Sequence, residues 1–152
     1  MKAATTYNSA DLALVERLRD QTGESVQLFV REGSSRRCVL SLQSPHALRW
    51  IVPEGVLFPL DVGSAGRALS GAADGAGWVE SVEEREAGVA SVSAPVLSPS
   101  GDIVAAVSVS GPIERLSLEG ATLVPLEAEP AAQEPVWPWQ RRVGSFFVYA
   151  EA

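Results

Sequence analysis

The chain has 152 residues, which suits a single domain, and one cysteine, which excludes an internal disulfide. Its 12 Lys and Arg against 19 Asp and Glu give a net charge of −7, so we expect no nucleic-acid binding by this chain alone, because such binding depends on clustered cations. No apolar run approaches the roughly 20 residues that cross a bilayer, and the N-terminus lacks the apolar centre of a secretion signal. We therefore expect a soluble, cytoplasmic protein with no membrane partner.

The first predicted elements are a helix and a β-hairpin. An amphipathic helix is predicted over Ser9 to Gln21, because a capping serine precedes an apolar stripe and Gly23 can end the last turn. Apolar and polar side chains then alternate over 26–31 and again over 36–42, on either side of a turn at Gly33. This alternation predicts two antiparallel strands.

The middle of the chain is predicted to hold a third strand and a short helix. The strand covers Leu48 to Val52, and a proline and a glycine separate it from the apolar run 56–60. Gly63 to Leu69 is predicted to form a tight turn that opens a short helix. Its free backbone N–H groups could hold a carboxylate or phosphate, although most such Gly-Ser runs are plain turns, and both interpretations stay open. Residues 71–77 form a predicted flexible connector.

A charged segment precedes the next strands. Ser81 and Glu84 have the spacing of a helix capping box, and Gly88 can close the turn that follows them. The acidic run 83–86 is predicted to be a solvated rim, not a general-acid pair or a metal site.

The most informative segment is Gly88 to Leu116, which predicts two β-strands joined by a tight turn. Side chains alternate along a strand, so each strand here has one apolar face and one face that carries serines. The apolar faces carry Val92, Ala94 and Val96 on the first strand and Ile103, Ala105, Val107 and Val109 on the second. The opposite faces carry Ser91 and Ser93, and Val104, Ala106, Ser108 and Ser110. These hydroxyl groups could line a cavity for a small polar molecule or face water, and the pattern leaves both open.

Catalysis is not predicted. The residues around Ser64 do not have the Gly-x-Ser-x-Gly spacing of an esterase, and His46 has no obvious partner that would orient it as a base. One histidine and one cysteine cannot supply the usual metal ligands, and no nucleotide-binding fingerprint is present. We expect no enzyme activity, no metal and no cofactor.

The last 36 residues or so differ in character from the rest. Four prolines between Pro125 and Pro138 exclude a continuous helix, and only Ser145 to Ala150 is predicted as a strand. We expect a domain at 1–116, followed at 117–152 by a divergent, proline-rich tail that is poorly ordered or loosely docked.

Three segments resemble the effector-binding domain of IclR-type bacterial transcriptional regulators. They are LVERLRDQTGESVQLFV (14–30), GVLFPLDVGSAGRALSG (55–71) and ESVEEREAGVASVSAPVLSPSGDIVAAVSVSGPIERL (80–116), of which the closing SVSGPIERL is the most specific. The resemblance implies an α+β, GAF-like fold, in which helices flank a curved antiparallel sheet and a small-molecule pocket lies on one side.

The resemblance also implies a function. Such a domain binds a metabolite, often a small organic acid, in a dimer or tetramer whose separate winged helix-turn-helix domain binds the promoter. The ligand contacts of the family fall here on Ser64, Ala65, Ser81, Ser91, Ser108 and Ser110. Asp61, Arg67 and Ser81 depart from the residues common in the family, so the effector of a relative cannot be transferred to this chain.

Both ends also depart from the family. The DNA-binding domain would precede Met1, so we expect this chain to lack it, and the residues from 117 onward do not supply the long closing helix, as in a truncated or frame-shifted chain. The alternative function is a protein-interaction or dimerisation module that binds no ligand and pairs with itself or with an intact regulator.

Overall fold

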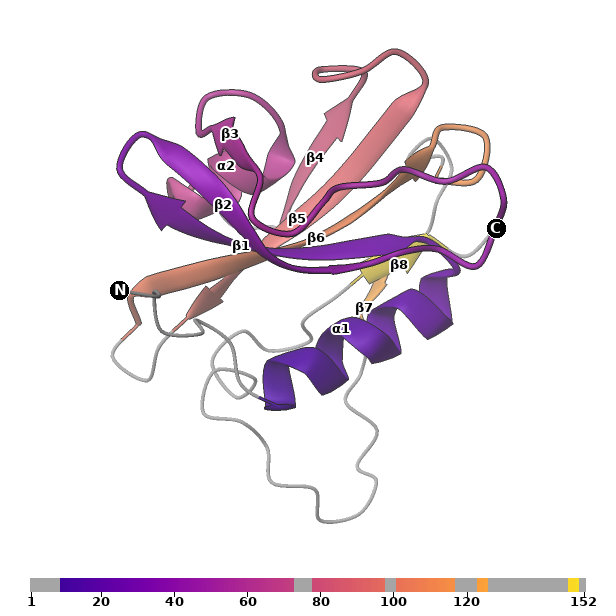
Figure 1. Cartoon of the computed structure of the whole chain (residues 1–152), viewed down its shortest axis with the longest axis horizontal. Helices are drawn as coiled ribbons and strands as arrows, with labels where there is room; N and C mark the ends of the chain where they lie inside the picture. Colours follow the sequence, from indigo (N-terminus) through magenta and orange to yellow (C-terminus); the bar gives the residue numbers. More distant parts are fainter. Residues whose placement is uncertain (1–8, 73–77, 98–100, 117–122, 126–147, 151–152) are drawn as a thin grey trace.

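The computed structural model describes residues 9–72, 78–97, 101–116, 123–125 and 148–150. Two helices and eight strands lie within these ranges (Figure 1). The elements are α1 (Ser9–Thr22), β1 (Ser25–Glu32), β2 (Ser35–Leu42), β3 (Leu57–Pro59), α2 (Ser64–Leu69), β4 (Val79–Val82), β5 (Val89–Leu97), β6 (Ile103–Pro112), β7 (Leu123–Pro125) and β8 (Val148–Ala150). No helix among the described residues is long and apolar enough to cross a membrane.

Six of the strands form one antiparallel sheet in the order β3-β2-β1-β6-β5-β4, which confirms the predicted α+β architecture. The two helices lie on opposite faces of this sheet (Figure 1). Val15 and Leu18 of α1 pack in one apolar cluster with residues of β1, β5 and β6, and Ala65, Ala68 and Leu69 of α2 pack in a second cluster with Phe29. Both faces are therefore covered.

The side-chain alternation predicted for β5 and β6 holds with one exception. Ala105, Val107 and Val109 pack in the cluster on the α1 face, whereas Ala106 belongs to the cluster on the α2 face. Ile103 was expected beside Ala105, but it packs on the α2 face, because a register shift between β5 and β6 after Val96 inserts an extra residue. The serine face is not solvated, because Ser93, Ser108 and Ser110 are 0%, 2% and 5% exposed beneath α2.

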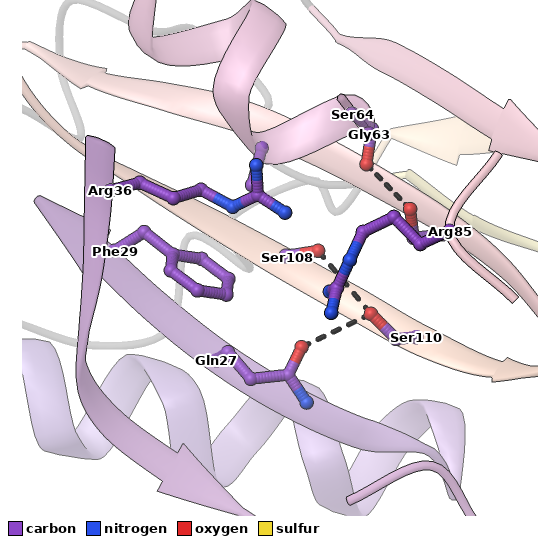
Figure 2. A pocket seen from close by; sticks show the side chains of 10 residues that line it. Gln27, Phe29, Arg36, Gly63, Ser64, Arg85, Ser108 and Ser110 are labelled. Atoms are coloured by element: carbon purple, nitrogen blue, oxygen red, sulfur yellow. Dashed lines mark hydrogen bonds between the residues drawn. The ribbon is translucent and has the colours of Figure 1, made fainter. Parts of the chain in front are cut away.

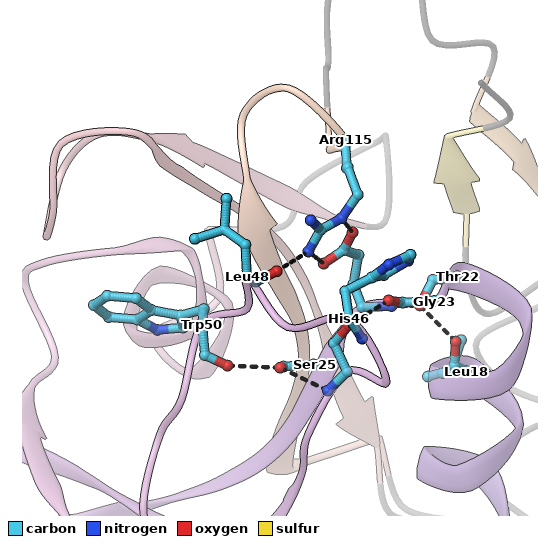
Figure 3. Close-up of polar contacts among 10 residues, drawn as sticks. Leu18, Thr22, Gly23, Ser25, His46, Leu48, Trp50 and Arg115 are labelled. Atoms are coloured by element: carbon cyan, nitrogen blue, oxygen red, sulfur yellow. Dashed lines mark hydrogen bonds and ion pairs between the residues drawn. The ribbon is translucent and has the colours of Figure 1, made fainter.

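The predicted strand at Leu48–Val52 is wrong, because those residues form a loop and the third strand is β3, which pairs with residues 35–37. Side-chain hydrogen bonds hold the loop against the start of β1 (Figure 3). Ser25 Oγ donates to the carbonyl of Trp50 at 2.6 Å and accepts from the amide of Ser44 at 3.0 Å. Bonds of this kind satisfy the loop backbone without a strand partner, which overrides a local β preference.

The predicted capping box at Ser81 is also wrong. Ser81 lies inside β4, where it pairs with Ser91, so its backbone belongs to the sheet and not to the start of a helix. Gly88 has a φ of 80° and ends the bend that joins β4 to β5, as predicted.

Part of the predicted tail is described. Its strand at 145–150 is observed as β8 over Val148–Ala150, which pairs with β7, and residues 145–147 lie outside the described residues. The remainder of the predicted tail and most of the connector, at 73–77, also lie outside them.

Candidate ligand-binding site

The site begins with the close packing of α2 on its surroundings. Gly66 has no side chain, and a Cβ placed on it would lie 2.1 Å from the carbonyl oxygen of Leu60, so α2 packs tightly against the turn that follows β3. The start of α2 also contacts the serine face of β5 through Ser64. Ser64 Oγ lies 2.6 Å from Ser91 Oγ and 2.7 Å from Ser93 Oγ, so the three hydroxyl groups share hydrogen bonds.

A small cavity lies between α2 and the serine face (Figure 2). Its lining residues are Gln27, Phe29, Arg36, Gly63, Ser64, Ala65, Arg85, Ser91, Ser108 and Ser110. Five of the six predicted site residues are therefore brought together, and Ser81 is not among them. Ser81 instead lies at the rim beside Glu84, where the hydrogen bond from Arg67 is the main cause of a lowered pKa of the Glu84 carboxyl and Ser81 makes a smaller contribution.

The cavity is small in this conformation. It leaves about 20 Å³ for the centre of a water molecule, which is enough for a single water and too little for an organic molecule. Arg36 and Arg85 occupy much of the space, and Figure 2 shows both side chains directed between the serines and Phe29. A larger ligand must therefore displace one of these side chains.

Arg36 is the most deeply buried charge of the site, at 1% exposure. Its Nη1 donates to the carbonyl oxygens of Pro59 at 2.5 Å and Val62 at 2.6 Å, which fixes the guanidinium group on the loop before α2. Its buried Nε has no hydrogen-bond partner. The Nε edge of the guanidinium group is thus buried and unpaired, and the hydrogen bonds of the group among the described residues come from Nη1.

In two other arginines of this chain, the edge formed by Nε and Nη2 binds a carboxylate. Arg37 donates from Nε and Nη2 to the two carboxylate oxygens of Glu32, at 2.5 and 2.8 Å. Arg115 does the same to Glu24, at 2.5 and 3.1 Å. A planar fork of two parallel N–H groups matches a carboxylate, so the unpaired edge of Arg36 is suited to a carboxylate from outside the chain.

Arg85 adds a second positive charge to the cavity. Its guanidinium carbon lies 3.6 Å from the ring centre of Phe58 and 5.7 Å from that of Trp50, and the side chain is half-buried. Arg36 also lies over Phe58, at 5.2 Å. Among the described residues, no carboxylate forms an ion pair with either arginine.

Burial opposes both charges. Desolvation lowers the pKa of Arg36, with a smaller contribution from the charge of Arg85, to about 10. Desolvation also lowers the pKa of Arg85, which Glu86 partly offsets. Both groups remain protonated at neutral pH, so the cavity is a positive site in a chain of net charge −7.

The opposite end of the cavity is polar but uncharged. Gln27 is 1% exposed, and its Oε1 accepts a hydrogen bond of 3.1 Å from Ser110 Oγ, while its Nε2 has no partner. Ser108 Oγ lies 3.4 Å from Ser110 Oγ. An anion could therefore accept hydrogen bonds from two N–H groups of Arg36. At the other end of the cavity, the side-chain amide of Gln27 could donate to an acceptor atom of the ligand.

Sequence reasoning missed Gln27, Phe29, Arg36 and Arg85. One signal was available for Arg36, because it alternates along β2 with Cys38 and Leu40, both of which are buried. Arg85 is the one cation within the acidic run 83–86, which obscured it.

The cysteine and the histidine considered for catalysis or metal binding do not line the cavity. Burial raises the pKa of the Cys38 thiol to about 12, so the thiol is protonated and unreactive at neutral pH. His46 is exposed, and its backbone amide donates to Ser44 Oγ at 3.1 Å. No group of three or more His, Cys, Asp or Glu residues within the described ranges could hold a metal ion.

Comparisons with known proteins agree with this architecture. Residues 73–135 match the family model described as the C-terminal domain of the bacterial transcriptional regulator IclR. A putative IclR-family regulator from Rhodococcus sp. is 27% identical with a TM-score of 0.66, over 78% of this chain and 57% of that protein. This chain therefore spans little more than half of that relative. Among curated proteins, none matches the sequence.

Two isolated domains are also similar. The C-terminal domain of a putative transcriptional regulator from Vibrio cholerae is 26% identical with a TM-score of 0.67, over 76% of this chain and 89% of that domain. The inducer-binding domain of PobR from Acinetobacter, a double mutant in complex with 3-hydroxybenzoic acid, is 18% identical with a TM-score of 0.64, over 74% and 87%. The second similarity shows the fold alone.

Proposed function

We propose that this chain, which matches the C-terminal domain of IclR-type transcriptional regulators, is an effector-binding domain that senses a small organic acid in the cavity beneath α2. The carboxylate of the acid binds the unpaired edge of Arg36 after a neighbouring side chain has moved aside. The serines and Gln27 contact the remainder of the molecule. The inducer-binding domain with 3-hydroxybenzoic acid bound supports an acid as the class of ligand.

The observation that carries this proposal is the buried Arg36 Nε without a partner. A buried donor without an acceptor destabilises the folded chain, and a bound carboxylate would satisfy Nε and Nη2 together. Hydrogen bonds to charged groups contribute about 1.5 to 3 kcal/mol each, so two of them with some apolar contact fit a dissociation constant of about 10 µM to 1 mM. That range suits a metabolite sensor.

The roles of the predicted site residues follow from their positions. Ser64, Ala65, Ser91, Ser108 and Ser110 line the cavity, and we assign them contacts with the ligand. Ser81 does not line it, and we assign it an indirect role through Glu84, which pairs with Arg67 on α2.

Replacing Arg36 with lysine should weaken the response to acids. Lysine keeps the charge but cannot present two parallel N–H groups, so we expect the dissociation constant to rise at least about tenfold. The measurement is the rise in Tm of the native chain and the variant across a panel of mono- and dicarboxylic acids. The double variant Ser108→Val, Ser110→Val tests the opposite end of the cavity in the same assay.

The matched control is Arg37→Lys, which lies next along β2 and holds the exposed Glu32 instead of facing the cavity. It should respond to acids like the native chain. If Arg36→Lys and the double serine variant both keep the native response, the acid does not bind in this cavity.

We further propose that the chain is cytoplasmic, is not an enzyme, does not bind DNA by itself and assembles as a dimer or tetramer, or with an intact regulator. In the alternative, an interaction module without a ligand, the chain's own aromatic side chains would fill the serine face. Trp78 does not do so, because it packs in the cluster on the α1 face, and Trp137 and Trp139 lie outside the described residues.

Native mass spectrometry of the protein purified from its host distinguishes the two functions. We expect an oligomer that retains a small acid, released by Arg36→Lys. An oligomer that never carries a small molecule, and whose Tm no acid raises, would favour the interaction module.

A further inference from the structure

We infer that the effector carries a second anionic group and that Arg85 receives it, so that the ligand is a dicarboxylic acid or another small dianion. This inference rests on the proposed function and goes beyond it by naming the ligand class that the cavity selects. It assigns Arg36 and Arg85 different tasks at the same site.

The charges of the cavity support a dianion. Two guanidinium groups line one cavity and share the ring of Phe58, and neither is paired with a carboxylate of the described residues. A monocarboxylate on Arg36 would leave the charge of Arg85 uncompensated beside it. A second anionic group would neutralise both, which matters because charges interact more strongly in a partly desolvated site than in water.

The acidic residues around Arg85 do not supply this compensation. Glu84 pairs with Arg67 and accepts from the amide of Gly63, and Glu83 accepts from the amide of Gly88 at 3.1 Å. Glu86 influences Arg85 only through space, without an ion pair. None of these three glutamates therefore forms an ion pair with Arg85, and the N–H groups of Arg85 stay available for an anionic group of the ligand.

Arg85 is also the side chain that can move. A cavity of about 20 Å³ admits no organic acid, so binding requires displacement. Arg36 is held by the carbonyl groups of Pro59 and Val62 and is almost fully buried. Arg85 makes no hydrogen bond among the described residues, is half-buried, and is held by ring contacts with Phe58 and Trp50.

These observations define a sequence of events. In the empty protein the guanidinium group of Arg85 covers Phe58 and closes the cavity. When an acid binds Arg36, Arg85 leaves this position, and its five N–H donors become available to the outer anionic group. Arg36 is thus the fixed contact, and Arg85 is the movable contact that discriminates between effectors.

Matched acids that differ by one carboxyl group test the inference. Binding of malonate, succinate, glutarate, adipate and isophthalate to the full chain is measured by calorimetry, beside propionate, butyrate, valerate, hexanoate and benzoate. We expect the best diacid to bind at least about tenfold more tightly than its monoacid, the usual strength of a charge-assisted contact. In Arg85→Gln this preference should fall to within about threefold, whereas Arg85→Lys should retain most of it.

Arg31→Gln is the matched control, because it removes one positive charge from an exposed position whose Nε donates only to the carbonyl of Gly33. It should keep the native preference. Equal binding of diacids and monoacids, or a preference that Arg85→Gln leaves unchanged, overturns the role of Arg85 while the proposed function survives through Arg36. If none of the ten acids binds the native chain at 10 mM (about the weakest useful affinity for a metabolite), both proposals fail.

Discussion

Replacing Gly66 with alanine is expected to lower the free energy of unfolding by about 3 kcal/mol or more. The new Cβ would lie 2.1 Å from the carbonyl oxygen and 2.7 Å from the carbonyl carbon of Leu60. These are backbone atoms, and the amide of Leu60 donates to the carbonyl of Ser34 at 3.2 Å, so the loop cannot yield cheaply. The gain in helix propensity from glycine to alanine, about 1 kcal/mol, does not offset the overlap.

The same substitution should also remove ligand binding. Relief of the overlap requires α2 to move away from Leu60, which separates Ser64 from Ser91 and Ser93. Arg36 would be disturbed as well, because its Nη1 lies 3.0 Å from the position of the new Cβ. The glycine thus serves both the packing of α2 and the position of the buried arginine.

Urea denaturation followed by circular dichroism measures the loss, and the rise in Tm with the best diacid measures binding. Gly33→Ala is the control, because Gly33 has a φ of 64° but no atom within 4 Å of its added Cβ. Its cost is the left-handed conformation alone, about 1 to 2 kcal/mol. If Gly66→Ala loses no more than Gly33→Ala, the close approach to Leu60 is not a constraint on the fold.

Most of the strands and the position of the candidate cavity could be predicted, because they depend on local patterns. Alternation along β5 and β6 placed Ser91, Ser108 and Ser110 on one face, and the glycines around Ser64 indicated the turn into α2. The side chains of adjoining strands meet wherever the register brings them together, so serines from separate segments converge in the structure. The resemblance to a family supplied the helices on both faces.

The arginines could not be predicted in the same way. A charged residue at an inward position of a strand is rare, because burial without a partner is unfavourable, so Arg36 was not considered for the site. Its inward position is tolerated because Pro59 and Val62, more than 20 residues away in the chain, present carbonyl groups to it. The error at Leu48–Val52 has a related cause, since Ser25 holds that loop through contacts that no local pattern encodes.

Replacing Arg115 with alanine is expected to lower the free energy of unfolding by about 3 kcal/mol, because it leaves the buried carboxylate of Glu24 without a counter-charge. Glu24 is 2% exposed, and Arg115 donates to both of its carboxylate oxygens (Figure 3). Arg115 also donates to the carbonyl of Leu48 at 2.5 Å, in the loop that carries Trp50 towards Arg85. We therefore also expect weaker binding of acids.

A double-mutant cycle measures the interaction energy between Glu24 and Arg115 separately from the effect of each substitution alone. Glu24→Ala should be less harmful than Arg115→Ala, because the arginine side chain left behind is 28% exposed and can be hydrated. The double variant should be more stable than Arg115→Ala alone, with a coupling energy of about 1 to 3 kcal/mol in urea denaturation. Arg19→Ala is the control, because its pair with Asp20 is exposed, and its loss should stay below about 0.5 kcal/mol.

The coupling energy from this cycle shows whether the charge pair helps to hold the loop that contains Leu48 and Trp50. If the two single losses simply add, Glu24 is hydrated when Arg115 is absent, and the loop is held by its hydrogen bonds to Ser25 and Arg115 without a contribution from the charge pair. If they couple, the residues just after β6 and just before β1 are joined by a stabilising charge pair. A displacement of Arg85 from Trp50 by an effector would then reach the same pair through the loop.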